Sequence, residues 1–486
     1  MLLSNALGLN LQQPALDFVD IDLDLDFPLY LDPAGFINPR DDFAEKCRVD
    51  LQDFFKTVLK AISKGDTTKS AALFEALSEP NETHLGVSQG KPDGRGIGKK
   101  QAQDILRNLQ NSVAGKTGLL KDLTDVALFV EGVGADKISD MTTNIIRRHL
   151  IEYTPQQFEL HHQTIQASVP TGPMWDTGNG QWVTDEFDKI PVVKGQKILL
   201  VPKRYVRWRG GLQQASTKYY NQFVTNYIRD EQLATNGNLV RVVKTKKSRK
   251  RVVYKKDIKE AHPPTKDFLA QFSGKHPNEY KKFRQTLDRF GPVGVRTIVE
   301  ANGKMFNETK FSKSLISALK KIAPGRKDAT AYHHLIMGII TYIFYPDLIT
   351  PTLEQDINSG RKRIDIMFSN SADEGFFKDR KDDPFTLARE ITFECKNYSD
   401  DIENPEFDQM AGRFDPRRGR FGVIACRTIE DRQKVLDRCK DAFQAQNGMI
   451  FVLCDDDFIT LLNEPEIVRY AKMQNMMRSW ARQIST

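Results

Sequence analysis

The chain has 486 residues, 40% of them hydrophobic and 28% charged, a balance typical of globular proteins with several hydrophobic cores. No apolar stretch reaches the roughly 20 residues that a membrane helix needs, and residues 1–14 lack a secretory signal, so we expect a cytoplasmic protein without membrane spans. The 71 Lys and Arg residues against 64 Asp and Glu residues give a net charge of +7, which permits a polyanionic partner without requiring one. The five cysteines are widely spaced, which favours reduced, buried thiols over disulfides or a zinc site.

The first part of the chain predicts mainly helices. Residues 16–31 alternate apolar and acidic side chains, which predicts an exposed strand with a solvated acidic face. Helical periodicity follows at residues 42–63, 99–112 and 128–154. We therefore expect a mostly helical N-terminal domain at residues 1–168, to which the sequence assigns no role.

Two Gly-x-Gly turns, at residues 96–98 and 132–134, precede helical segments. They are either plain helix starts or the phosphate-binding turns of helix-hairpin-helix modules, in which N–H groups at a helix N-terminus hold a DNA phosphate.

The middle of the chain predicts a separate α+β domain at residues 169–315. Its start is rich in aromatic residues, Pro and Gly, and a buried strand is expected at 197–202. Residues 241–256 place two short β-branched strands around a basic turn, which predicts a hairpin with a cationic tip formed by Lys246, Lys247, Arg249, Lys250 and Arg251. These cations either contact nucleic-acid phosphates or keep an exposed hairpin soluble.

The last third, residues 316–486, is the most regular part. Helices are expected at 328–344, 405–412 and 429–446, and strands at 348–353, 363–368, 389–398, 421–426 and 449–454, with a polar loop at 369–386. Strands separated by helices indicate a mixed sheet flanked by helices. The whole chain is thus predicted to be a multidomain α+β protein with a C-terminal α/β domain.

One strand of this domain carries charge in apolar surroundings. Side chains alternate along a strand, so Glu394 and Lys396 share one face, and Asp365 would face them across about 5 Å if its strand pairs with theirs. Two carboxylates that close repel each other unless a cation lies between them, and hard oxygen ligands indicate Mg²⁺ or Mn²⁺. An ammonium beside the ion can orient an attacking water and offset charge on a phosphate. The pattern therefore predicts a metal-dependent phosphodiesterase site.

Asp365 and the Glu394-Cys395-Lys396 run, followed by a helix that carries Gln409, resemble the motif of the PD-(D/E)xK nuclease superfamily. The strand at Glu394 is similar to that of the Mrr-like branch, and the resemblance covers residues 323–462. It implies a restriction-endonuclease-like fold for the C-terminal domain and a Mg²⁺-dependent or Mn²⁺-dependent endonuclease activity.

The resemblance also implies roles for particular residues. Asp365, Glu394 and the carbonyl of Cys395 would ligate the metal, Lys396 would be the catalytic cation, and Gln409 would support the site.

The chain departs from the family pattern near this motif. Arg413 stands where a tyrosine often follows the helix glutamine, and Ile364 replaces the proline of the name. Where some members carry a glutamate on the first helix, this chain has His333 and His334, which either pack in the core or touch the metal or a phosphate; Glu354 is a spare acid.

Two basic clusters flank the motif and would lie along a nucleic-acid backbone. They consist of Arg361, Lys362 and Arg363 before Asp365, and of Arg413, Arg417, Arg418 and Arg420 after the Gln409 helix.

These features favour an endonuclease that hydrolyses DNA phosphodiester bonds, similar in layout to restriction-like or anti-phage defence effectors. DNA is the expected substrate, a protein encoded in the same defence operon is a further candidate partner, and cutting both strands predicts a homodimer or larger assembly. The alternatives are a non-catalytic nucleic-acid-binding or scaffold protein, or an RNA or junction nuclease.

Overall fold

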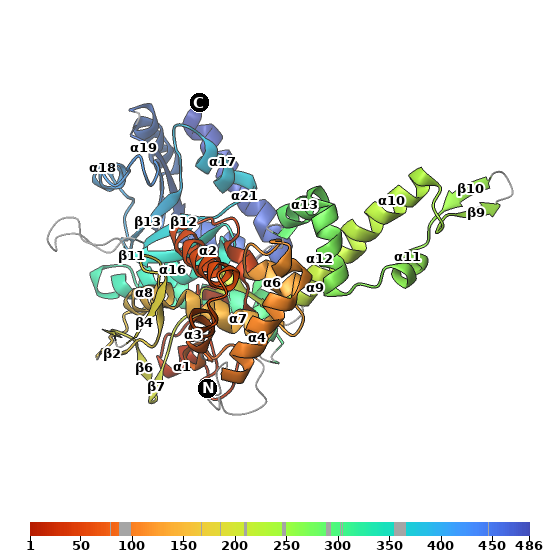
Figure 1. Ribbon diagram of the computed structural model, residues 1–486. Coiled ribbons are helices and arrows are strands. Elements are labelled where there is room, and N and C mark those ends of the chain that lie inside the picture. Colours follow the sequence, from red (N-terminus) through yellow and green to blue (C-terminus); the bar gives the residue numbers. More distant parts are fainter. Residues whose placement is uncertain are drawn as a thin grey trace.

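The computed structural model is a mostly helical α+β protein whose last third forms a five-stranded mixed sheet flanked by helices (Figure 1). The structure describes residues 1–77, 79–86, 99–166, 168–184, 186–208, 211–244, 249–287, 293–301, 303, 305–353, 366–445 and 447–486. No helix within these residues is long and apolar enough to cross a membrane. The coarse fold class predicted from the sequence is confirmed.

The C-terminal sheet has the order β11-β12-β13-β14-β15. Its strands are β11 Leu348–Leu353, β12 Ile366–Asn370, β13 Glu390–Lys396, β14 Phe421–Cys426 and β15 Met449–Cys454. The first three strands are antiparallel neighbours, whereas β13, β14 and β15 run parallel. Every residue of β14 and β15 is buried, as expected for continuous apolar runs inside a parallel sheet covered on both faces.

Helices cover this sheet. They are α16 Ala329–Ile343, α17 Gly375–Asp382, α18 Asn404–Ala411, α19 Arg432–Gln444, α20 Asp455–Leu462 and α21 Glu466–Ser485. The polar loop predicted at 369–386 is wrong in part, because it contains α17. Phe376 and Phe377 are buried and anchor this helix on the sheet, where Phe376 packs on Phe421 of β14 and Phe451 of β15.

The N-terminal helices are α1 Leu3–Ala6, α2 Asp42–Ser63, α3 Thr67–Glu75, α4 Lys99–Asn111, α5 Val113–Lys116, α6 Leu123–Phe129, α7 Ala135–Ile145 and α8 Arg147–Leu160. The short strands of this part form two-stranded sheets. The pairs are β1 Leu29–Leu31 with β8 Val206–Trp208, β2 Val169–Pro170 with β5 Phe187–Asp188, β3 Met174–Asp176 with β4 Gln181–Val183, and β6 Val192–Val193 with β7 Gln196–Lys197. The helices predicted at 42–63 and 99–112 are confirmed, and the segment at 128–154 is divided among α6, α7 and α8. The strand predicted at 197–202 is mostly a buried segment outside any strand.

The predicted exposed strand at 16–31 is wrong, because only its last three residues form a strand. Asp17 and Asp20 are buried rather than solvated. Asp17 accepts a hydrogen bond from the Tyr153 hydroxyl at 2.7 Å, and Asp20 accepts bonds from the backbone and hydroxyl of Ser4 at 2.8 and 2.7 Å. These bonds offset the cost of burying the carboxylates.

Polar contacts join the N-terminal helices to the sheet domain. Asp17 also accepts a bond from Thr350 N on β11 at 3.1 Å, and Gln157 Nε2 on α8 donates to Pro351 O at 3.0 Å. Gly338 lets α16 approach the N-terminal segment closely, since a Cβ there would lie 3.0 Å from Leu11. Because α8 packs along β11, this edge strand of the sheet is covered.

An arm projects from this body (Figure 1). It leaves through α9 Gly211–Lys218, a π-helical turn Tyr219–Val224 and α10 Thr225–Thr235, and carries the hairpin β9 Arg241–Lys244 and β10 Arg249–Val252 at its far end before α11 Lys255–Ala261 returns. The predicted basic hairpin is thus confirmed as an antiparallel pair. The chain re-enters the body through α12 Lys266–Lys275, α13 Pro277–Leu287, α14 Val295–Glu300 and α15 Glu308–Lys321.

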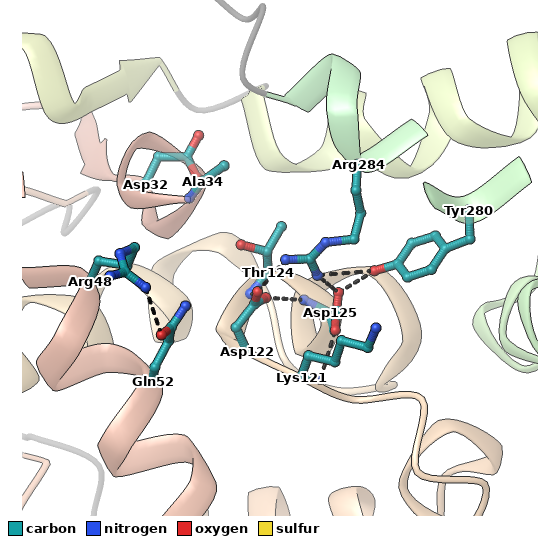
Figure 2. A network of polar contacts seen from close by, with 10 residues as sticks. All are labelled: Asp32, Ala34, Arg48, Gln52, Lys121, Asp122, Thr124, Asp125, Tyr280 and Arg284. Carbon is teal, nitrogen blue, oxygen red and sulfur yellow. Dashed lines mark hydrogen bonds and ion pairs between the residues drawn. The ribbon is translucent and has the colours of Figure 1, made fainter. Parts of the chain in front are cut away.

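A buried polar network ties α13, which follows the arm, to the N-terminal helices (Figure 2). Arg284 on α13 donates to both Asp122 and Asp125 at the start of α6, and the Tyr280 hydroxyl also donates to Asp125. Burial raises the pKa of Asp125 to about 7, while the guanidinium of Arg284 acts in the opposite direction. Removal of Arg284 would therefore leave a buried acid without its main counter-charge.

We expect Arg284→Ala to lower the free energy of unfolding by about 3–5 kcal/mol, the usual effect of removing one partner from a buried ion pair. Urea denaturation followed by circular dichroism measures this change. Lys282→Ala is the matched control on the same helix, because Lys282 pairs with Glu279 at the surface and its loss should cost about 0.5 kcal/mol or less. Equal effects of the two substitutions would contradict this account of the network.

Candidate functional site

Glu394 and Lys396 lie next to each other at the carboxyl end of β13. The Lys396 Nζ atom is 2.5 Å from Glu394 Oε1, and the two residues are only 3% and 2% exposed. The charged face predicted for this strand therefore exists, while Phe393, the residue before Glu394, packs against Phe368 and Phe344. A charge buried this deeply needs a partner, and each residue of the pair supplies one to the other.

The helix α18 adds two more polar groups to this pair. A capping box between Glu403 and Glu406 fixes the start of the helix. Gln409 then faces β13 and accepts a hydrogen bond from Lys396 Nζ at 3.1 Å. Arg413, just after the helix, places its Nε atom 3.6 Å from Glu394 Oε2. The carboxylate of Glu394 thus lies between two cations.

A cavity of about 200 Å³ opens beside this group. It is lined by His162, Gly325, Arg326, Ala329, Thr330, His333, Glu394, Cys395, Asn397 and Tyr398. Asn397 shapes its wall, because its Nδ2 donates to Ala323 O at 3.0 Å and Gly325 O at 2.8 Å. Gly325 adopts a φ of 116°, which side chains rarely allow, so this loop needs a glycine to meet the end of β13.

Histidines from both halves of the molecule meet at the cavity. His162, just after α8, lines it together with His333 of α16. The other two histidines pack behind them, with His161 Nδ1 2.8 Å from His334 Nε2. Burial lowers the pKa of His161 to about 3 and that of His334 to about 4, so both rings are neutral at pH 7. His334 is therefore a packing residue, whereas His333 borders the cavity.

Two of the predicted basic residues lie elsewhere. Arg417 and Arg418 line a separate cleft of about 1000 Å³ at the opposite end of β13, together with residues 38–42 and Glu45. Arg418 Nε there lies 3.7 Å from Glu390, the first residue of the strand. Among the arginines predicted to follow α18, Arg413 is the one that reaches Glu394.

Other predicted site residues lie outside the described residues or far from β13. Asp365, Glu354, Arg361, Lys362, Arg363, Lys246 and Lys247, and the Gly-x-Gly turn at 96–98, lie outside the described residues. Arg249, Lys250 and Arg251 are on β10 at the end of the arm, away from β13 (Figure 1).

The described residues supply one acidic metal donor at this site. Within them, no group of three or more His, Cys, Asp and Glu side chains is placed to hold a metal ion. Burial raises the pKa of the Cys395 thiol well above its usual value, so this side chain is a neutral thiol rather than a thiolate ligand. Glu394 remains as the hard oxygen donor, and a metal site needs a second carboxylate from outside the described residues.

The sequence did not reveal two residues of this site. Arg413 was predicted as a contact to nucleic acid, not as a neighbour of Glu394, and His162 was not singled out at all. The available signal for the first was an arginine at the position where the family that the motif resembles often has a tyrosine. His162 comes from a helix more than 150 residues earlier in the chain, and no local pattern indicates that contact.

A family model described as "Domain of unknown function (DUF8370)" matches residues 8–212. No curated protein and no solved structure matches the chain. The matched segment runs across the boundary at residues 168/169 that the sequence suggested, and the three-domain division stays a prediction. The match ends before the sheet domain, yet it includes α8 and His162, so the cavity beside Glu394 is shared between the matched segment and the sheet domain.

The lowered pKa values predict a stability that depends on pH. Between about pH 6.5 and 4 the unfolded chain binds more protons on His161 and His334 than the folded chain does, so stability rises with pH and is lost on acidification. We expect the melting temperature to fall from pH 7 to pH 5, and to fall less in a His161→Gln, His334→Gln double variant. Differential scanning fluorimetry measures both, and an identical fall in the two proteins would contradict the assignment.

Proposed function

We propose that the chain is a metal-dependent endonuclease that hydrolyses DNA phosphodiester bonds at the end of β13. The observation that carries this proposal is the buried Glu394 and Lys396 pair, contacted by Gln409 and bordered by a cavity. A buried ion pair contributes little to stability compared with apolar residues of the same size. The position of the pair at the buried end of β13, next to a cavity, therefore supports a chemical role.

Asp365 is the proposed second carboxylate. The last described pair of β12 and β13 is Ile366 with Phe393, and Asp365 and Glu394 are the next residues of the two segments in the antiparallel direction. We propose that Asp365, Glu394 and the carbonyl of Cys395 hold Mg²⁺ or Mn²⁺. The hard carboxylate oxygen of Glu394 at the cavity wall fits such an ion, and the neutral thiol of Cys395 does not compete with it.

Lys396 and Gln409 have distinct parts in this proposal. A bound divalent ion supplies a Lewis acid that polarises the phosphate and lowers the pKa of a coordinated water. Lys396 places a positive charge where negative charge develops on the phosphate during attack, and it can orient the attacking water. Gln409 keeps the ammonium in position through its own hydrogen bond, which does not depend on Glu394. Arg413 is close enough to Glu394 to contact the same phosphate.

Because one such site cuts one strand, cleavage of both strands requires two copies of the chain, and a homodimer or larger assembly is part of the proposal. A role as a restriction-like or anti-phage effector also belongs to it, with the matched N-terminal segment as the part that controls access to the shared cavity.

A non-catalytic nucleic-acid-binding protein is the second candidate. It is favoured by the two cations, Lys396 and Arg413, that already surround Glu394. Titration calorimetry with Mg²⁺ and Mn²⁺ separates the candidates. Binding that is lost in Glu394→Gln supports the nuclease, and no binding of either ion supports the second candidate.

We expect Lys396→Met and Glu394→Gln each to reduce Mg²⁺-dependent cleavage of duplex DNA by about 100-fold or more, the usual effect of removing a group that stabilises the transition state. Lys396→Met keeps an apolar stem in the buried position. Lys434→Ala, an exposed lysine on α19, is the control and should cleave like the wild type. Gel assays of DNA cleavage test this, with variants whose melting temperatures match that of the wild type. Undiminished cleavage by Lys396→Met would refute the assignment.

A further inference from the structure

We propose that the arm, through its described residues 225–244 and 249–261, is a second DNA contact that binds the phosphate backbone of a duplex away from the Glu394 site. The choice of DNA over another polyanion rests on the proposed function. The arm projects from the body and ends in the β9–β10 hairpin, so it can reach a ligand that the body does not touch (Figure 1).

The arm holds the charge excess of the whole protein. Residues 225–261 contain eleven Lys and Arg residues and four Asp and Glu residues, a net charge of +7, which equals the net charge of all 486 residues. The remainder of the chain is therefore balanced. A segment that concentrates the entire positive excess is the part of the molecule that attracts a polyanion.

The cations on the two strands of the hairpin are exposed to solvent. Lys244 pairs with Arg249 and Val242 pairs with Arg251 in the register, so their side chains lie on one face. Lys244, Arg249 and Arg251 are exposed, and Val242 is 60% exposed, so the chain itself does not bury this face. Within the described residues, no acidic side chain forms an ion pair with Lys244, Arg249 or Lys250.

The base of the arm differs from its tip. Arg241, at the start of β9, is neutralised by Asp257 of α11 at 2.7 Å. Ile228 of α10 and Ile258 of α11 are buried, so these helices pack on each other. The acidic partner at the base orients the hairpin, while the cations toward the tip remain available for a ligand.

The arm is held in place rather than loosely tethered. Its outgoing helix is continuous from α9 through the π-helical turn to α10, about 37 Å at 1.5 Å per residue. At the body, the Tyr219 and Ser273 hydroxyls lie 2.7 Å apart, and the Tyr220 hydroxyl donates to His262 O at 2.6 Å. A fixed arm can add binding energy at a defined distance from the cutting site without a large ordering cost.

Phosphates fit this surface better than an acidic protein does. Side chains two apart on a strand are about 6.7 Å apart, and a duplex carries one negative charge per about 1.7 Å of its axis, so several phosphates meet the cations at once. Protein interfaces usually have an apolar core with aromatic anchors. The hairpin offers cations around a single exposed valine, which suits a contact that ignores base sequence.

The test measures binding without catalysis, by fluorescence anisotropy in EDTA. The arm variant replaces Lys244, Arg249, Lys250 and Arg251 with Gln; the control replaces Lys56, Lys60, Lys64 and Lys69, four exposed lysines of the N-terminal helices, and so changes the net charge equally. The probes are a 40-bp duplex, a 10-bp duplex and polyglutamate, in a series of salt concentrations. Circular dichroism confirms that both variants fold.

We expect the arm variant to bind the 40-bp duplex about 10-fold or more weaker than the wild type. Each lost phosphate contact lowers the slope of log affinity against log salt by about 0.9, so the slope should fall by up to about 3–4. The control should stay within about twofold, and the arm variant should lose less affinity for the 10-bp duplex, which is too short to reach the hairpin and the body at once, than for the 40-bp duplex.

Several results would overturn the proposal: wild-type affinity of the arm variant for the 40-bp duplex, an equal loss in the control, or polyglutamate binding as tight as DNA binding and equally lost in the arm variant. These outcomes are independent of cleavage. If Lys396→Met cleaves normally while the arm variant loses DNA binding, the catalytic assignment fails and the arm proposal stands.

Discussion

The contact between Glu394 and Lys396 is the constraint on which the rest of the C-terminal domain depends. Two opposite charges are buried at the end of β13, and their desolvation is tolerable only because each satisfies the other and because Gln409 and Arg413 complete the surroundings. The start of α18 is fixed by its capping box and the loop before α16 by Asn397, so both elements serve to enclose this pair. Glu394 lines the cavity, so this member of the pair is available to a ligand.

The N-terminal segment is part of this arrangement rather than an appendage. It covers the edge strand β11 through α8, bonds to β11 through Asp17 and Gln157, and supplies His162 to the cavity wall. A change in the packing of α8 would therefore alter both the edge of the sheet and the cavity. This coupling gives a physical route by which the segment that matches the DUF8370 model can influence the proposed chemistry.

Local patterns predicted the sheet domain well. The bounds of β14 and β15 follow from apolar runs between turn residues, and the charged face of β13 follows from strand alternation. Features that depend on contacts between residues far apart in the sequence could not be predicted from local patterns. Asp17 was expected in solvent because its partners, Tyr153 and Thr350, are more than 100 residues away, and α17 was missed because its two phenylalanines are surrounded by charges. His162 was missed for the same reason, since only the folded chain brings α8 beside α16.

The central claim is that the Glu394 site hydrolyses phosphodiester bonds with a divalent ion. The most direct measurement is an incubation of the purified protein with circular duplex, linear duplex, single-stranded DNA and RNA, with Mg²⁺ or with EDTA, followed by mapping of the cut ends. We predict cleavage of the circular duplex at internal positions with Mg²⁺ and no cleavage in EDTA. All four substrates remaining intact with Mg²⁺ and with Mn²⁺, or equal cleavage in EDTA, would contradict the account.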